Sequence, residues 1–164
     1  MGRPYTGSAD AVHSAKRPGT EMLLNMLLFL VPGTKNLGVF SNRDMRGKPG
    51  QKSVHATWRA FDIGYPNPDA GRAIVQLLEQ HADSLLIEEI HDYAGVSKAG
   101  TEKWGRGWRC TRKEFGGGPG WRDWSAEANG GTPGGKWIHV EVAPAAADDA
   151  SIIENAFKKA FSAL

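Results

Sequence analysis

Two histidines and one aspartate are the residues of this chain whose types and spacing could bind a metal ion. His55 and Asp62 lie seven positions apart, and His139 follows near the C-terminus in the sequence Trp-Ile-His-Val-Glu. A catalytic zinc ion takes two neutral imidazoles and one carboxylate and leaves its fourth position to water. Taken singly, such residues more often have structural roles, at a strand end, in a turn or in a core. The three residues alone therefore leave both interpretations open.

The sequence around the first two residues resembles a zinc-peptidase signature. The segment from Ser53 to Asp62 is similar to the motif S-x-H-x-x-G-x-A-x-D, with matches at Ser53, His55, Ala60 and Asp62 and with Trp58 in place of the glycine. This signature is typical of zinc peptidases that cut peptidoglycan peptides. They comprise D-alanyl-D-alanine carboxypeptidases, vancomycin-resistance dipeptidases and phage L-alanyl-D-glutamate endolysins, and are related to lysostaphin and the hedgehog fold. The resemblance covers roughly residues 37 to 142.

The resemblance implies a zinc ion bound by His55, Asp62 and His139, and a peptidoglycan stem peptide as the substrate. It also implies that Arg43, which follows a short strand ahead of the first motif, binds a substrate carboxylate through its planar guanidinium. The implied setting is bacterial or phage lysis. We expect the protein to be cytoplasmic at synthesis, and to reach the cell wall after lysis-dependent release or as part of a phage particle.

Residues beside the metal ligands are the further candidates for contact with substrate. We assign this role to Ser53, Trp58 and Trp137, which lie in the two motifs.

The acid/base residue must come from a position other than the one the family uses. In the family it lies two or three residues before the last ligand, and here those positions are Trp137 and Lys136. Along the strand predicted for residues 137–142, Trp137, His139 and Glu141 share one face. Glu141 could orient His139 or act as the general base, and we choose it as the candidate catalytic residue. Without a base, the chain would be a catalytically degenerate cell-wall binding module on the same scaffold.

A second group of acid/base candidates follows the middle of the chain. Glu88, Glu89 and His91 belong to or follow a strand predicted for residues 85–90. Alternation puts Glu89 and His91 on one face and Glu88 on the other. The competing interpretation, which we favour for each residue singly, is a solvated strand edge.

The spacing of the first motif requires a special backbone. In a flat strand, positions seven apart point to opposite faces, so His55 and Asp62 can share a metal only if residues 56–58 contain a turn or bulge. Trp58 must make that turn without the glycine of the family, or else the backbone is ordinary there and Trp58 forms a wall of the cleft.

A stretch rich in glycine and tryptophan separates the two motifs. The residues from Gly95 to Lys136 have no clear periodicity and include Trp104, Trp108, Trp121 and Trp124. Loops of this length tend to be functional lids or binding loops. The tryptophans could stack on sugars, bases or peptide, or form a satellite hydrophobic cluster that holds the loop.

Composition argues against several other classes of protein. The net charge of +2 and the pI of 8.7 are too mild to predict nucleic-acid binding. The apolar run from Met22 to Val31 is about ten residues long, which is too short to span a bilayer. The single cysteine, Cys110, excludes an internal disulfide and fits a structural thiol better than a reactive one.

The elements that must position these residues define an α+β fold. Helical spacing of apolar residues predicts helices from Thr20, from an Asp69 cap, and from a cap at Asp148 or Asp149. Strands are predicted at 37–41, 85–90 and 137–142. We expect a flexible arm over residues 1–19 and one zinc-peptidase-like domain over residues 20–164. The domain would be a small antiparallel sheet covered by helices, with a long Gly/Trp-rich insert.

Overall fold

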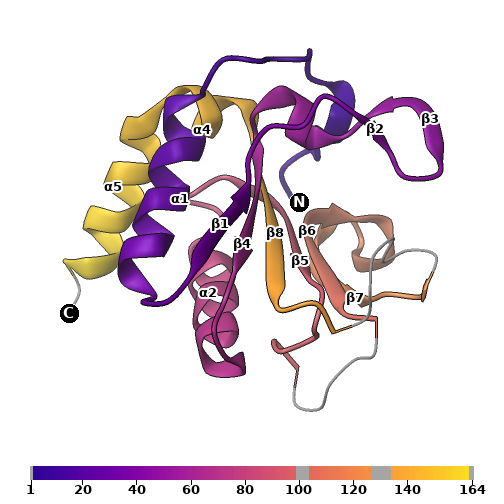
Figure 1. The fold of residues 1–164 in the computed structure, drawn as a ribbon. Helices are drawn as coiled ribbons and strands as arrows, with labels where there is room; N and C mark the ends of the chain where they lie inside the picture. The colour runs from indigo at the N-terminus through magenta and orange to yellow at the C-terminus, as the bar shows by residue number, and fades with distance from the viewer. Residues whose placement is uncertain (1, 99–103, 127–133, 163–164) are drawn as a thin grey trace.

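The computed structural model describes residues 2–98, 104–126 and 134–162, and it confirms the α+β class (Figure 1). Six antiparallel strands form one sheet in the order β1-β4-β8-β5-β6-β7. Their bounds are β1 Lys35–Gly38, β4 Ala60–Gly64, β5 Ile87–Asp92, β6 Arg106–Arg112, β7 Gly118–Asp123 and β8 Trp137–Val142. A small hairpin of β2 (Asp44–Met45) and β3 (Lys48–Lys52) stands apart from this sheet.

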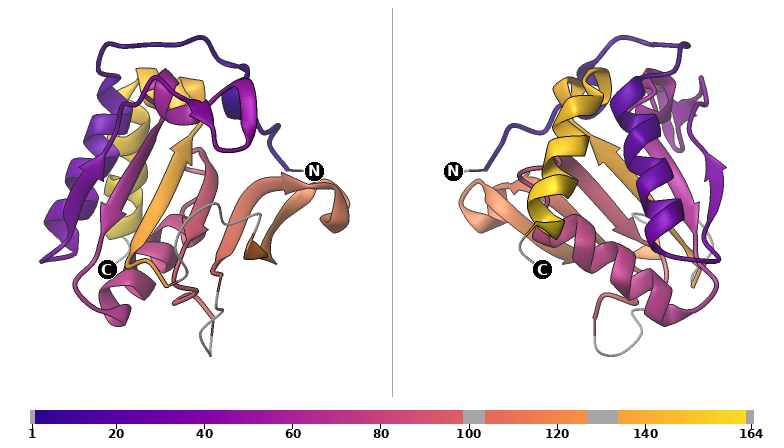
Figure 2. Two further views of the ribbon diagram at one scale, coloured as in Figure 1. Left: turned by 45° about the vertical axis from the view of Figure 1, so that its right-hand side comes forward. Right: turned by 90° about the vertical axis from the view of Figure 1, so that its left-hand side faces the viewer.

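The helices lie on one face of the sheet and leave the other face open (Figure 2). They are α1 Pro18–Leu30, α2 Pro68–Gln80, α4 Pro144–Asp148 and α5 Ala150–Phe161. Two of their N-termini are capped by side chains that accept from backbone amides, Asn67 from Ala70 and Asp149 from Ser151. The N-cap therefore lies two residues before the predicted Asp69, because Pro68 already occupies the first helical position.

The core lies between the helices and the sheet. The last strand, β8, turns Ile138, Val140 and Val142 towards the helices, and all three side chains are fully buried. From α1, α2 and α5 come apolar residues spaced by three or four positions, such as Leu23, Leu27, Ile74, Leu78, Ile153 and Phe157. Because neighbours alternate along a strand, the other side chains of β8 face the open side of the sheet, as predicted for Trp137, His139 and Glu141.

The Gly/Trp-rich insert is more regular than predicted. Its described part contains β6, a 3-10 turn at Lys113–Phe115 and β7, which together extend the sheet as a hairpin. Trp108 lies opposite Trp121 across this hairpin, and Trp108 and Cys110 belong to the core. Glycine and arginine interrupt the apolar alternation here, so the period of a strand was not visible. Burial raises the pKa of the Cys110 thiol to about 11, which agrees with a structural role.

Polar contacts join the N-terminal segment, predicted as a flexible arm, to the rest of the chain. Arg17 is buried, and its guanidinium donates to Asp10 at 2.7 Å and to Asp148 at 2.7 Å. A second buried guanidinium, that of Arg59, donates to the carbonyl oxygen of Gly7. Polar pairs leave no periodic pattern in a sequence, so hydrophobic periodicity could not reveal these contacts.

In the part of the chain that the structure describes, no helix combines the length and the apolar character needed to cross a membrane.

Candidate metal centre and its cleft

A tight turn brings the first two predicted ligands together. Residues Val54–Thr57 form a 3-10 turn, and Trp58 follows in the left-handed conformation with φ 55°. This is the turn required between His55 and Asp62, and it falls where the family signature has glycine. A left-handed residue with a side chain costs roughly 1–2 kcal/mol. Trp58 is held by stacking on Phe40 at 5.0 Å.

Strand register brings the third ligand to the same point. Asp62 on β4 lies directly opposite His139 on β8. The Oδ1 atom of Asp62 is 2.9 Å from His139 Nδ1 and 3.3 Å from His55 Nε2, and the two nitrogens are 3.1 Å apart. Across the three residues, the ligand atoms lie within 4.8 Å of one another. The structure therefore brings together the predicted set of ligands.

The outer hydrogen bonds of the two histidines decide what their inner nitrogens can do. His55 Nδ1 lies 2.7 Å from the carbonyl oxygen of Val39, and a carbonyl can only accept. His139 Nε2 lies 3.0 Å from the carboxylate oxygen Oε1 of Glu141. With both outer nitrogens donating, the inner nitrogens direct lone pairs at Asp62. Three acceptors that converge in this way need a cation between them, so the donor set fits a metal ion.

Electrostatics support the same conclusion. Burial lowers the pKa of His139, but hydrogen bonds to Asp62 and Glu141 outweigh it and raise that pKa to about 10. Burial alone would raise the pKa of Asp62, whereas its interactions with the imidazoles of His139 and His55 bring it well below its usual range. Without a metal, a proton therefore stays among these groups at neutral pH, and a bound metal would replace it.

Glu141 has both carboxylate oxygens engaged. Oε1 pairs with His139, and Oε2 accepts from the hydroxyl of Tyr5 at 2.9 Å. Its side chain is also buried. Of the two roles considered for Glu141, the contacts favour orientation of the metal ligand His139 over action as the general base.

A second polar group lies beside the metal ligands on β5. This strand is in the interior of the sheet between β8 and β6, so the interpretation of a solvated edge is wrong. His91 lies opposite His139, and its Nε2 is 2.6 Å from Glu89 Oε1. Glu89 also accepts from Arg109 at 2.9 and 2.8 Å. Burial would raise the pKa of Glu89, but the charges of His91 and Arg109 lower it below its usual range.

Glu88, the third acid/base candidate of this strand, is engaged elsewhere. It is buried and accepts from the guanidinium of Arg59 at 3.2 Å. It does not line the cleft that holds the metal ligands.

The metal ligands and the β5 group line one cleft of about 540 Å³. The predicted residues on its wall are Arg43, Ser53, His55, Asp62, His139, Glu141 and Trp137, and also Glu89 and His91. Trp58 is not on this wall, because its ring packs on Phe40 and its indole N–H donates to Glu21 at 3.0 Å. Of the two alternatives for Trp58, the structure therefore supports the first: Trp58 makes the turn and does not form a wall of the cleft.

Aromatic residues complete the cleft. The tryptophans of the insert divide between the two predicted roles, a binding surface and a hydrophobic cluster. Trp124 packs edge-on against His91 at 4.8 Å, so it belongs to the cleft, whereas Trp108 belongs to the core. Trp137 stacks on Tyr93 at 3.8 Å. Tyr93 and Tyr5 were not predicted as site residues. Tyr93 had a signal, because it lies two positions after His91 on the same side of the chain; Tyr5 had none.

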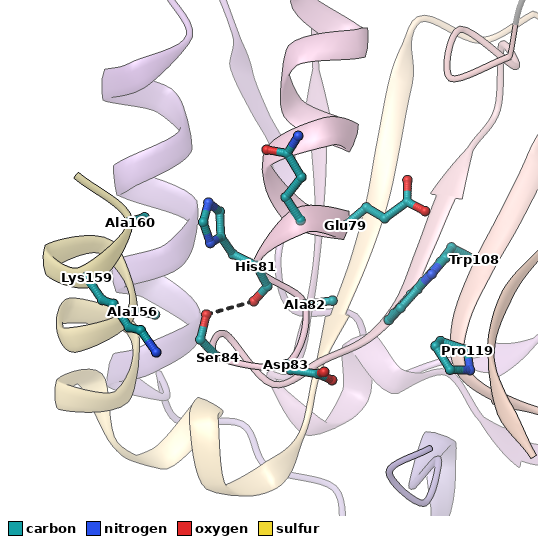
Figure 3. A pocket seen from close by; sticks show the side chains of 11 residues that line it. Glu79, His81, Ala82, Asp83, Ser84, Trp108, Pro119, Ala156, Lys159 and Ala160 are labelled. Carbon is teal, nitrogen blue, oxygen red and sulfur yellow. Dashed lines mark hydrogen bonds between the residues drawn. The ribbon is translucent and has the colours of Figure 1, made fainter. Parts of the chain in front are cut away.

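A second cavity of about 560 Å³ lies where the ends of α2 and α5 approach the β6–β7 hairpin (Figure 3). Its wall includes His81, Trp108 and Lys159, and Ser84 donates to the backbone carbonyl of His81 at 3.1 Å. Among the described residues, the side chains close enough to share a metal ion are His55, Asp62 and His139. None of these three lines the second cavity.

Comparison with protein families, with curated proteins and with solved structures finds no match for this chain.

Proposed function

We propose that this protein is a zinc-dependent peptidase that hydrolyses an amide bond of peptidoglycan stem peptides. One observation carries the proposal. His55 Nε2, Asp62 Oδ1 and His139 Nδ1 converge within 4.8 Å of one another, and both histidines have their outer nitrogens anchored. The substrate class is supported by the resemblance of residues 53–62 to the signature of the peptidoglycan peptidases.

Each ligand has a partner that fixes it in the cleft. His55 is held by the carbonyl of Val39 and His139 by Glu141, so each turns its inner nitrogen towards Asp62, where a metal would replace the shared proton. When bound, zinc lowers the pKa of water towards about 7 and polarises a carbonyl group. Arg43, on the wall of the same cleft, is placed to bind a carboxylate of the peptide.

The proton-transfer role belongs best to His91. Glu89 holds its Nε2 at 2.6 Å, as a carboxylate holds the imidazole of a hydrolase triad. Its Nδ1, which lies 3.4 Å from the hydroxyl of Tyr93, would exchange a proton with the reacting groups. The ring of His91 is 5.4 Å from that of His139, and it lines the cleft. His91 would thereby supply what Lys136 and Trp137 cannot.

Digestion of purified peptidoglycan tests this proposal. The zinc-loaded parent protein should release free amino groups from the cell wall, and a chelator should stop the release. The variant His91→Gln should keep its zinc and lose about 10²- to 10⁴-fold in rate, the usual contribution of a positioned acid/base group. His81→Gln, outside the cleft, is the matched control and should digest at the parental rate.

The competing function is a catalytically degenerate cell-wall binding module, favoured by Lys136 and Trp137 at the usual acid/base positions. A zinc-loaded parent that sediments with peptidoglycan but releases no amino groups would establish that function and refute the peptidase.

A further inference from the structure

The N-terminal segment brings one side chain into the cleft. Tyr5 lines it, and its hydroxyl lies 2.8 Å from Glu89 Oε2 and 2.9 Å from Glu141 Oε2. The ring lies under the guanidinium of Arg109, 3.9 Å from the ring centroid. A residue 136 positions earlier in the chain thus contacts the carboxylate that orients His139.

Backbone and side-chain contacts hold this segment on both sides of Tyr5. The amide of Gly2 donates to the carbonyl of Gly117 at 2.8 Å, and the guanidinium of Arg3 donates to the carbonyl of Ile87. On the other side of Tyr5, the amide of Gly7 donates to Glu88 at 3.3 Å. The position of the phenol is therefore fixed by the chain before and after it.

The hydroxyl of Tyr5 is the hydrogen-bond donor for a buried oxygen of Glu141, to which no other described residue donates. Glu141 Oε1 is committed to His139, and Oε2 depends on the single hydroxyl hydrogen of Tyr5, which it shares with Glu89 Oε2. Glu89 Oε2 has Arg109 as a second donor. A buried carboxylate oxygen that loses its donor is strongly unfavourable, so the carboxylate would rotate or change partners. Either change would weaken the bond to His139 Nε2 that directs the Nδ1 lone pair inward.

We infer that Tyr5 is a positioning residue of the metal centre: through Glu141 it holds His139 in the form that binds a metal, so the N-terminal segment sets the metal affinity of the cleft. This inference rests on the metal site of the proposed function. It does not depend on the substrate or on any peptidase activity.

The variant Tyr5→Phe removes the hydroxyl and keeps the ring. Its zinc dissociation constant, measured by competition with a chromophoric chelator, should rise about 10- to 100-fold, as for the loss of other groups that orient metal ligands. Tyr65→Phe is the matched control. Tyr65 is buried and its hydroxyl makes no hydrogen bond to any of the described residues, so this variant should keep the parental affinity. A Tyr5→Phe affinity equal to that of the parent would overturn the inference.

A double-mutant cycle separates positioning from a general effect on the fold. If Tyr5 acts through Glu141, Tyr5→Phe should weaken zinc binding in the parent but have almost no further effect in the Glu141→Ala background, which lacks the carboxylate. Equal losses in both backgrounds would show that Tyr5 acts by another route and would refute the inference. Chemical unfolding of each metal-free variant checks that the fold is intact.

The outcomes also separate this inference from the proposed function. Weaker zinc binding in Tyr5→Phe, together with a parent that does not digest peptidoglycan, supports the inference and refutes the peptidase. Digestion of peptidoglycan by the parent, together with unchanged zinc affinity in Tyr5→Phe, supports the peptidase and refutes the inference. A parent protein that binds no zinc refutes both.

Discussion

Two cavities of nearly equal size, about 540 and 560 Å³, differ in how their charged groups are held. In the cleft, the side chains of Glu89 and Glu141 are 2% and 7% exposed and each accepts from more than one donor. In the second cavity, the carboxylate of Asp83 is fully exposed although it pairs with Arg3. Burying a charge is costly unless it is paired. Convergence of buried, paired groups therefore distinguishes the cleft with the candidate metal ligands from the second cavity, and volume does not.

The difference follows from the elements that build each cavity. The cleft lies over β4, β8 and β5, where strand register places Asp62, His139 and His91 side by side. The second cavity lies between the ends of helices and a hairpin edge, where side chains project towards solvent. A sheet thus fixes the relative positions of site residues more closely than helix ends do.

The largest expected difference between the cavities is in metal content. His139→Ala removes one of three ligands and should abolish zinc binding, whereas His81→Ala in the second cavity should leave it intact. Elemental analysis of the purified proteins should give about one zinc per chain for the parent and for His81→Ala, and none for His139→Ala. Full zinc content in His139→Ala would place the metal elsewhere.

The next difference concerns stability. Glu89→Gln leaves Arg109 without its buried carboxylate partner, which should lower the free energy of unfolding by about 3 kcal/mol. Asp83→Asn removes an exposed partner of Arg3 and should cause no measurable change. Urea unfolding of the two metal-free variants makes the comparison. Equal losses would show that burial is not what separates the two sets of charges.

The smallest expected difference is in metal affinity. Glu141→Gln still accepts through its amide oxygen but loses the charge that supports His139, so zinc should bind about 10- to 100-fold more weakly. Glu79→Gln, in the wall of the second cavity, is the matched control, with the same chemical change outside the cleft. A chelator competition assay measures both, and an affinity loss in Glu79→Gln would contradict a local effect.

The candidate metal ligands could be predicted because their signals are local. The residue types at His55, Asp62 and His139 match zinc chemistry, and the seven-residue spacing alone required a turn, which the structure confirms at Trp58. The faces of β8 were also predictable, since Ile138 and Val140 alternate with polar residues. The helices followed from apolar spacing, although the N-caps of α1 and α2, Arg17 and Asn67, lie three and two residues before the predicted Thr20 and Asp69.

The features that the sequence did not predict depend on contacts between residues distant in the chain. The central place of β5 is set by its neighbours β8 and β6, so charged residues at Glu89 and His91 gave the appearance of a solvated edge. Tyr5 reaches the cleft through polar contacts with Glu89 and Glu141, which leave no periodic pattern. Trp58 was predicted to contact substrate, but stacking on Phe40 turns it out of the cleft.

The place of β8 in the sheet has a consequence for the order of folding. It is the last strand in the sequence, yet it lies between β4 and β5. During synthesis, β4 and β5 must therefore wait with one edge each unpaired until residues 137–142 have left the ribosome. Pairings between such distant segments form slowly, and unpaired edges are prone to aggregation while they persist. Because His139 arrives with β8, the metal centre forms only when the sheet closes, and bound metal would report that folding is complete.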